Sequence, residues 1–281
     1  TGVFEVNDVV ELLDDSKWPL QVFDVSYLIV AGGGGAGTGN DAPGGGGAGG
    51  LRNSFGSESS GGGGSTETPL QNIGADGSTT YTVTVGAGGN TNSKGSNSVF
   101  HTFTSEGGGL GGASNNQSGG TGGSGGSGGG GGHASGGAGA GTSNQGFAGI
   151  AGNTSDASNH QGGGGGGAGA TGGYGGNAAG VSSSITGSAV TYVQGGERAT
   201  KFGNSSSNSG AGDVVAANTG GGGNAGGGGN TSRPGGSGVV ILRYPSNVSI
   251  TAGSGLTSST ATDGAFKVTT FTAGTDTIVF T

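Results

Sequence analysis

The sequence predicts a mostly irregular and β fold, in which a polyglycine-II helix bundle is flanked by β-strands, a short N-terminal helix and a C-terminal β-hairpin. Glycine supplies 80 of the 281 residues, against a usual share of about 7 %. The β-branched and aromatic residues gather into short segments beside the glycine tracts. Three parts are expected: an N-terminal helical attachment segment (1–21), a glycine-rich domain (22–245) and a C-terminal hairpin segment (246–281).

The first expected element is a short helix over residues 8–13. Asp8 is suited to cap the free N–H groups at the start of this helix, and Glu11 stands at the capping-box position three residues later. Pro19 follows the segment and cannot continue a helix. We therefore expect one or two helical turns here and no longer helix.

Several segments are expected to be strands, because β-branched and aromatic residues dominate them. They are 22–31, 80–85, 99–104 and 239–244. The chain ends with two further segments of this kind, 266–272 and 277–280, separated by Ala273-Gly274-Thr275-Asp276. Such a spacer suits a four-residue hairpin loop, so the end of the chain predicts a β-hairpin.

The middle of the chain has a repeat of three residues. Between Gly119 and Gly132 nearly every residue is glycine, and the others are spaced at multiples of three: Ser118, Thr121, Ser124, Ser127 and His133. Three residues per turn is the period of the polyproline-II conformation. Side chains would then share one edge, and bare edges would let neighbouring backbones approach closely. This pattern carries the prediction of a polyglycine-II bundle.

Polar interruptions between the glycine tracts are expected to be loops, because Asn, Ser and Asp favour turns. A glycine scaffold has few side chains with which to discriminate ligands, so binding is expected on these loops. The candidate binding residues are Asn153, Asp156, Asn159 and His160 in one loop, and Tyr192, Glu197, Arg198, Lys201 and Phe202 in another. For Tyr192 and Phe202 the alternative is a place in a small hydrophobic core.

Composition and motifs argue against several functions. A net charge of −8 without basic runs disfavours nucleic acid as a partner. The longest apolar run, 27–31, is far shorter than the ~20 residues that a membrane helix needs. A G-x-G-x-x-G match at 32–37 is not followed by a helical pattern, and the G-x-S-x-G match around Ser124 lacks the strand and helix of a nucleophile elbow.

The histidines do not suggest a metal site. His101, His133 and His160 lie far apart in the sequence without metal-ligand spacing, and we expect them on the surface or in loops. No metal, no cofactor and no catalytic residue is therefore expected, and the chain is not expected to be an enzyme.

Three segments carry a resemblance to a known family. Residues 25–35, 81–89 and 235–245 read VSYLIVAGGGG, YTVTVGAGG and GGSGVVILRYP. They resemble the glycine-rich domains of bacteriophage tail fibres and tail-fibre tip adhesins, over roughly residues 22–245. The long interruption at 181–217 departs from the most regular members of that group.

The resemblance implies an extracellular virion protein that presents variable loops to a host cell-surface receptor. That receptor would be a saccharide or an outer-membrane protein, and other tail-fibre subunits would be partners. Fibre shafts are commonly homotrimers and tip adhesins can be monomers, so the resemblance leaves both states open.

Two other functions compete with receptor binding. The first is a structural fibre or matrix protein that binds no receptor, which adsorption to cells would distinguish from an adhesin. The second is an ice-binding polyglycine-II protein, motivated by the row formed by Ser118, Thr121, Ser124 and Ser127. Thermal hysteresis would identify the ice-binding protein.

Overall fold

The computed structural model describes residues 22–115, 118–153, 160–200, 215–228 and 231–281. The predicted helix at 8–13 lies outside these residues. Within them the chain forms strands β1 to β14 and no helix. Accordingly, the described part of the chain holds no helix long and apolar enough to cross a membrane.

The main element is a ten-stranded antiparallel sheet. Its central path runs β2-β1-β11-β14-β4-β5-β6, with β3 paired to β1 and with β12 and β13 paired to β14. The seven strands of the path form a nearly closed barrel. The strands of this sheet are β1 (Val22–Val30), β2 (Leu51–Asn53), β3 (Leu70–Gly74), β4 (Thr80–Thr84), β5 (Ser98–Phe100), β6 (Phe103–Ser105), β11 (Val239–Pro245), β12 (Ile250–Ala252), β13 (Leu256–Asp263) and β14 (Phe266–Phe280).

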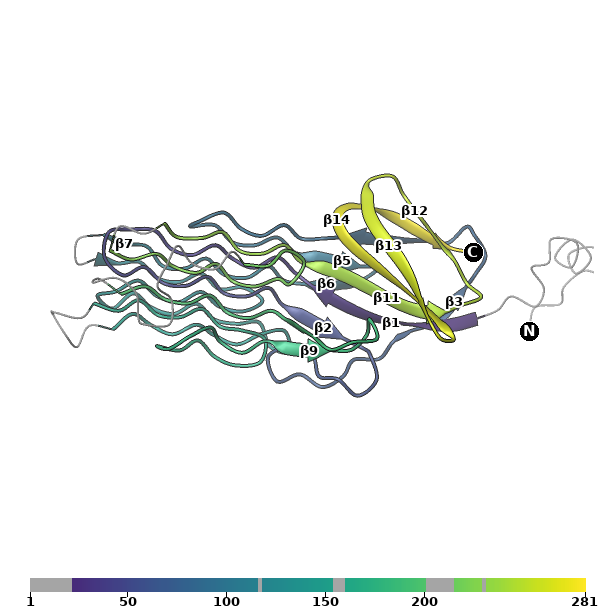
Figure 1. Cartoon of the computed structure of the whole chain (residues 1–281), viewed down its shortest axis with the longest axis horizontal. Coiled ribbons are helices and arrows are strands. Elements are labelled where there is room, and N and C mark those ends of the chain that lie inside the picture. The colour runs from purple at the N-terminus through teal and green to yellow at the C-terminus, as the bar shows by residue number, and fades with distance from the viewer. Residues whose placement is uncertain (1–21, 116–117, 154–159, 201–214, 229–230) are drawn as a thin grey trace, which may run out of the picture.

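Two small hairpins lie outside this sheet. β7 (Ser114–Asn115) pairs with β8 (Ser118–Gly119), and β9 (Val181–Ser183) pairs with β10 (Val190–Tyr192). Figure 1 shows the sheet strands gathered at one end of an elongated molecule and β7 at the opposite end. We call the end that carries β7 the distal end.

The predicted polyglycine-II bundle is wrong as a description of the fold, which is all-β in its regular structure. The triplet spacing misled because glycine fills so many positions that the remaining residues fall into such spacings without sharing an edge. Thr121 and Ser124 are exposed, whereas Ser127 is fully buried. A row that would order water for ice binding needs a common exposed face, and these residues do not form one.

The predicted strands at 22–31, 80–85 and 239–244 are confirmed as β1, β4 and β11. The segment 99–104 instead forms β5 and β6, which pair through a tight turn. His101 occupies this turn with a φ of 54°, in the left-handed region that turns often use. One predicted strand is therefore a small hairpin.

The predicted hairpin of 266–272 with 277–280 is wrong, because 266–280 forms the single continuous strand β14. The segment 246–281 does contain a hairpin, but its two strands are β13 and β14. Residues near Phe271 pair with β11 on one side and with β13 on the other, while Ile278 pairs with β4 and β12. Partners along both halves keep the chain extended through 273–276. Gly274 takes a φ of 98° beside the register shift between β13 and β14, so glycine serves a bulge here instead of a turn.

Both faces of the central strands are buried. Tyr27 of β1 and Leu242 of β11 lie in one hydrophobic cluster with Phe271, whereas Leu28 and Ile241 lie in a second cluster on the other face. Strands covered on both sides read as continuous apolar runs. This is why 27–31 and 239–242 lack the alternation of a half-exposed strand.

The glycine tracts extend from this sheet as segments without assigned secondary structure, and they run side by side along the long axis (Figure 1). Their backbones bond to tracts distant in the sequence. Gly46 N donates to Gly223 O at 2.9 Å and Gly130 N to Gly45 O at 2.9 Å. A Cβ added at Gly130 would lie 2.0 Å from the carbonyl oxygen of Gly163. Main-chain contacts that leave no space for side chains hold these tracts together. We call the tracts outside the sheet the glycine body.

Candidate functional site at the distal end

Two polar segments that the sequence places apart meet in the structure. Gln161 forms isolated antiparallel bridges with both Asn153 and Thr200. The binding candidates around residue 153 and those around residue 198 therefore lie on neighbouring segments. His160 precedes Gln161 and stacks on His133, whose Nδ1 lies 3.4 Å from Ser114 Oγ of β7. The meeting point is thus at the distal end.

The described binding candidates divide into two groups. Asn153, Glu197 and Arg198 are half-buried and His160 is buried, all on the joined segments. Tyr192 lies apart, because it is only 5 % exposed and packs in the hydrophobic cluster that includes Leu28 of β1. Tyr192 occupies the core position that was the alternative for it. Four further candidates lie outside the described residues: Asp156, Asn159, Lys201 and Phe202.

An arginine and a tyrosine lie against each other at the distal surface. The Nε of Arg198 donates to the carbonyl oxygen of Tyr174 at 2.7 Å, and its Nη2 donates to the same oxygen. The guanidinium lies 5.8 Å from the centroid of the Tyr174 ring, within cation–π range. Tyr174 is 44 % exposed and donates its hydroxyl to Ala151 O at 2.9 Å. We call Tyr174 and Arg198 the distal pair.

Hydrogen-bonding capacity remains free next to this pair. Nη1 of Arg198 and Oε2 of Glu197 are both buried and have no hydrogen-bond partner. Burial lowers the pKa of the Arg198 guanidinium, and the charge of Glu197 opposes that shift. Unsatisfied buried polar atoms are uncommon in native proteins, and each calls for an explanation.

Sequence reasoning missed Tyr174 as a binding candidate, because the residue lies within a glycine tract, 172–176, and not in one of the polar interruptions. The sequence nevertheless contained an observation that could have identified Tyr174. Tyr174 is an isolated aromatic residue in a tract of small residues, where no core exists to require it.

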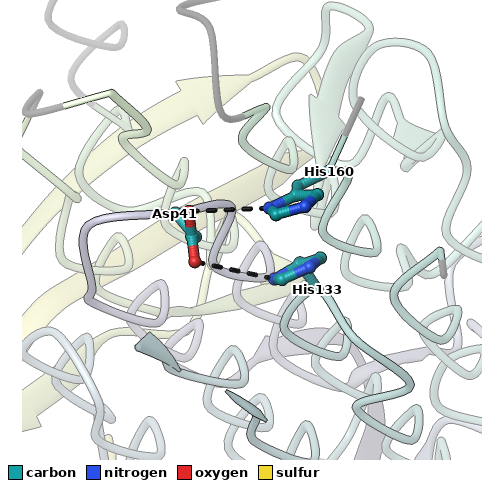
Figure 2. Close-up of side chains that lie close together, drawn as sticks. All are labelled: Asp41, His133 and His160. Carbon is teal, nitrogen blue, oxygen red and sulfur yellow. Dashed lines mark ion pairs between the residues drawn. The ribbon is translucent and has the colours of Figure 1, made fainter. Parts of the chain in front are cut away.

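A second cluster at the distal end is buried, and Figure 2 shows it. Asp41 Oδ1 lies 3.6 Å from His160 Nδ1, and Asp41 Oδ2 lies 3.9 Å from His133 Nδ1. The imidazole rings stack with centroids 3.7 Å apart and planes 10° from parallel. His160 Nδ1 is buried without a hydrogen-bond partner. These residues offer three donor atoms that all lie within 4.8 Å of one another, so they could hold a metal ion.

His133 and His160 lie outside any helix or strand, which agrees with the expected loop location, but both are buried and neither is on the surface. His133 is 4 % and His160 is 6 % exposed, whereas His101 is exposed. The cluster could not be found from sequence spacing, because its members come from separate turns. His133 N donates to Ala42 O at 2.9 Å, which brings the turn that carries Asp41 to the histidines.

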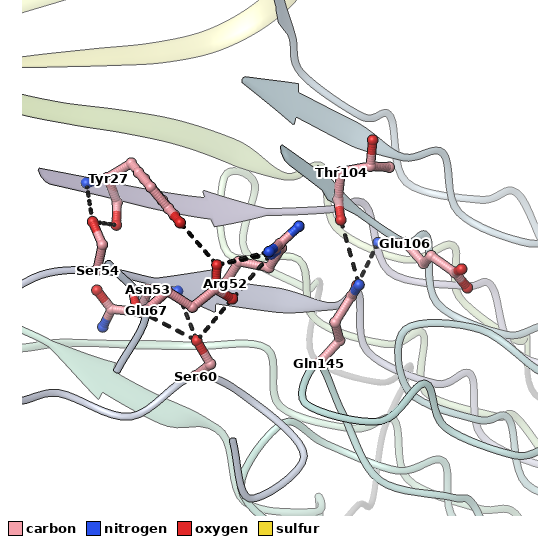
Figure 3. A network of polar contacts seen from close by, with 9 residues as sticks. All are labelled: Tyr27, Arg52, Asn53, Ser54, Ser60, Glu67, Thr104, Glu106 and Gln145. Atoms are coloured by element: carbon pink, nitrogen blue, oxygen red, sulfur yellow. Dashed lines mark hydrogen bonds and ion pairs between the residues drawn. The ribbon is translucent and has the colours of Figure 1, made fainter. Parts of the chain in front are cut away.

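A third polar cluster lies beside the sheet (Figure 3). Arg52 Nε donates to Glu67 Oε1 at 2.9 Å, and the Tyr27 hydroxyl donates to Glu67 Oε2 at 2.8 Å. Burial raises the pKa of Tyr27, and the hydrogen bond to Glu67 raises it further. Ser60 Oγ also donates to Glu67 Oε1 at 3.2 Å. Both carboxylate oxygens are occupied, so this network serves to fix the loop after β2 to the sheet.

The fold and the distal clusters define a glycine-rich, all-β module that carries clustered polar side chains at its distal end. The chain belongs to the family of the glycine-rich domain, whose model matches residues 14–245. No curated protein matches the chain, and neither does any solved structure.

Proposed function

We propose that this chain is a receptor-binding module of the bacteriophage tail-fibre type, which works outside the cell as part of the virion. Its distal end would contact the host cell surface, and its sheet end would adjoin other tail-fibre subunits. The observation that carries the proposal is the meeting of the segments around Asn153 and Arg198 at the end opposite the sheet. The proposed role is binding and not catalysis.

The glycine body suits this role because it holds the polar segments in place before a ligand arrives. Gly162 N donates to Ala199 O at 3.0 Å, and Ala199 N donates to Pro43 O at 3.1 Å. The segment that carries Arg198 is therefore bonded into the body on both sides. A surface ordered in advance loses less conformational entropy on binding, which supports recognition by loops on a scaffold of small residues.

The distal pair indicates the chemistry of the receptor. An exposed tyrosine ring offers an apolar face with a polar tip, and arginine offers several donors in a fixed plane. Tyrosine and arginine are also enriched among residues that dominate binding energy at interfaces. These features suit a saccharide or an exposed loop of an outer-membrane protein, and we place receptor contact at Tyr174 and Arg198.

The test is adsorption of the purified, fluorescently labelled chain to a panel of bacterial strains. We expect saturable binding to a subset of strains, which an excess of unlabelled chain blocks. Tyr174→Ala and Arg198→Ala should each weaken that binding by about 30-fold, since residues that dominate an interface contribute about 2 kcal/mol or more.

The matched control is a similar pair at the sheet end. The Arg243 guanidinium lies 4.6 Å from the centroid of the Phe266 ring, and Phe266 is 42 % exposed. Phe266→Ala should leave adsorption unchanged. Absence of saturable binding to every strain would favour a structural fibre or matrix protein, and equal loss in all three variants would remove the distal end from the proposal.

A further inference from the structure

We propose that Asp41, His133 and His160 bind one divalent transition-metal ion of the zinc class. Two imidazoles and one carboxylate form a donor set common in zinc sites. All three residues are buried, at 8 %, 4 % and 6 % exposure. The inference is independent of the proposed receptor role, because it concerns only what this cluster binds.

The spacing of the donor atoms fits a shared ion. Zinc bonds to nitrogen and oxygen of about 2.0–2.1 Å place neighbouring tetrahedral ligands about 3.3–3.5 Å apart. The two Asp–His separations are 3.6 and 3.9 Å. The three donor atoms lie within 4.8 Å of one another, so a contraction of at most about 1.4 Å, with the stacked rings tilted until their lone pairs converge, would bring them onto one ion.

The unsatisfied nitrogen of His160 is a separate observation that points to a ligand. His160 Nδ1 is buried, faces Asp41 and has no hydrogen-bond partner. A buried polar atom without a partner is unfavourable unless something supplies the missing bond. A metal ion between the rings and Asp41 would supply the bond that His160 Nδ1 lacks and would pair with the carboxylate.

The donor types select the metal. Imidazole suits zinc, nickel, cobalt and copper ions, whereas calcium and magnesium prefer sets made of oxygen ligands. The trio leaves at least one coordination position for water. Ser114 Oγ lies 3.4 Å from the same nitrogen, His133 Nδ1, so with that nitrogen bound to the metal the hydroxyl would be placed to hydrogen-bond the water ligand.

A bound ion would join three segments that the sequence keeps far apart. Asp41 belongs to the turn after Gly39, and His133 stands where the tract 128–132 ends. His160 is separated from the tract 162–167 by Gln161 alone. A cross-link between distant segments restricts the unfolded chain more than it restricts the native one, so metal should stabilise the distal end.

The experiment uses the full chain without a polyhistidine tag, dialysed against a chelator and titrated with zinc chloride by calorimetry. We expect one zinc ion per chain and no comparable binding of calcium. His160→Gln, His133→Gln and Asp41→Asn should each weaken zinc binding at least about 10-fold, since even changes outside the ligand shell cost about 10- to 100-fold. His101→Asn, at the exposed third histidine, should bind like the wild type.

X-ray absorption at the zinc edge of the wild-type complex tests the site without any substitution, in case a variant fails to fold. The spectrum should show two imidazole ligands together with oxygen. Absence of zinc binding by the wild type would overturn the proposal. Unchanged affinity in the three ligand variants, or a spectrum without two imidazoles, would overturn it as well.

Discussion

The sheet end and the glycine body are held together in opposite ways. At the sheet, large side chains such as Tyr27, Phe100 and Phe271 are fully buried against one another. In the body, contact is made by backbone, and an added Cβ would overlap carbonyl oxygens at about 2 Å at most of the buried positions, such as Gly46 and Gly163. The two regions should therefore be destabilised by opposite kinds of substitution. Smaller side chains should destabilise the sheet, and larger side chains should destabilise the glycine body.

The energetic terms differ accordingly. Burial of a large apolar side chain contributes about 1.5–3 kcal/mol at the sheet. An ordered glycine costs about 0.5–1 kcal/mol more than alanine, while a main-chain hydrogen bond contributes only about 0.5–1.5 kcal/mol net. The body therefore depends on nearly every tract finding its partners, as Gly112 does with Gly130 and Gly130 with Gly45.

The largest effect should come from removing a core aromatic residue. Phe271→Ala should lower the free energy of unfolding by about 3–5 kcal/mol, because it leaves a cavity at a fully buried position of β14. Urea denaturation followed by tyrosine and tryptophan fluorescence measures the change. A loss below about 1 kcal/mol, the level of many surface substitutions, would show that side chains do not dominate the sheet.

The next effect tests the body with the smallest possible addition. Gly130→Ala should destabilise the chain by about 1–3 kcal/mol or more, because the new methyl would meet the backbone of Gly163 at 2.0 Å. Gly175→Ala is the matched control, since an added Cβ there has nothing within 4 Å. Thermal unfolding of both variants gives the comparison. Equal melting temperatures would contradict main-chain packing as the basis of the body.

The smallest effect concerns the hydrogen bonds that Glu58 accepts near the sheet. It tests the comparison through the pH dependence of the free energy of unfolding. Burial by itself would raise the pKa of Glu58, but hydrogen bonds from Ser183, Ser184 and Asn53 outweigh it and lower that pKa. A lowered folded-state pKa means that the stabilisation is complete above the ordinary value of 4.5 and is lost as the pH falls below it. Wild type should therefore lose more stability than Glu58→Gln between about pH 7 and pH 3.

The measurement for Glu58 is the urea midpoint of both proteins across that pH range. At about pH 7 the variant should be the less stable protein, because glutamine cannot replace the charge-assisted hydrogen bonds. Parallel losses in the two proteins would show that this carboxylate does not link the loop after β2 to the β9–β10 hairpin.

Part of the distal site could be predicted from the sequence. The polar interruptions identified Asn153 and Arg198, because a glycine scaffold confines side-chain chemistry to such segments. Tyr192 shows the limit of that argument, since an aromatic residue in a polar interruption also suits a core, and burial decides between the two. The cluster of Asp41, His133 and His160 could not be predicted, because sequence spacing carries no information on which turns pack together across the glycine body.

The sequence by itself determined the strands β1, β4 and β11, since continuous or alternating apolar runs have a local physical cause. It also determined that most of the middle would lack side-chain packing, because glycine has no side chain to pack. Only the tertiary structure decided that 266–280 remains one strand, that the triplet-spaced residues of 118–133 share no exposed edge, and that Asp41 meets His133 and His160. Each of these depends on contacts between residues distant in the chain, which local preferences do not encode.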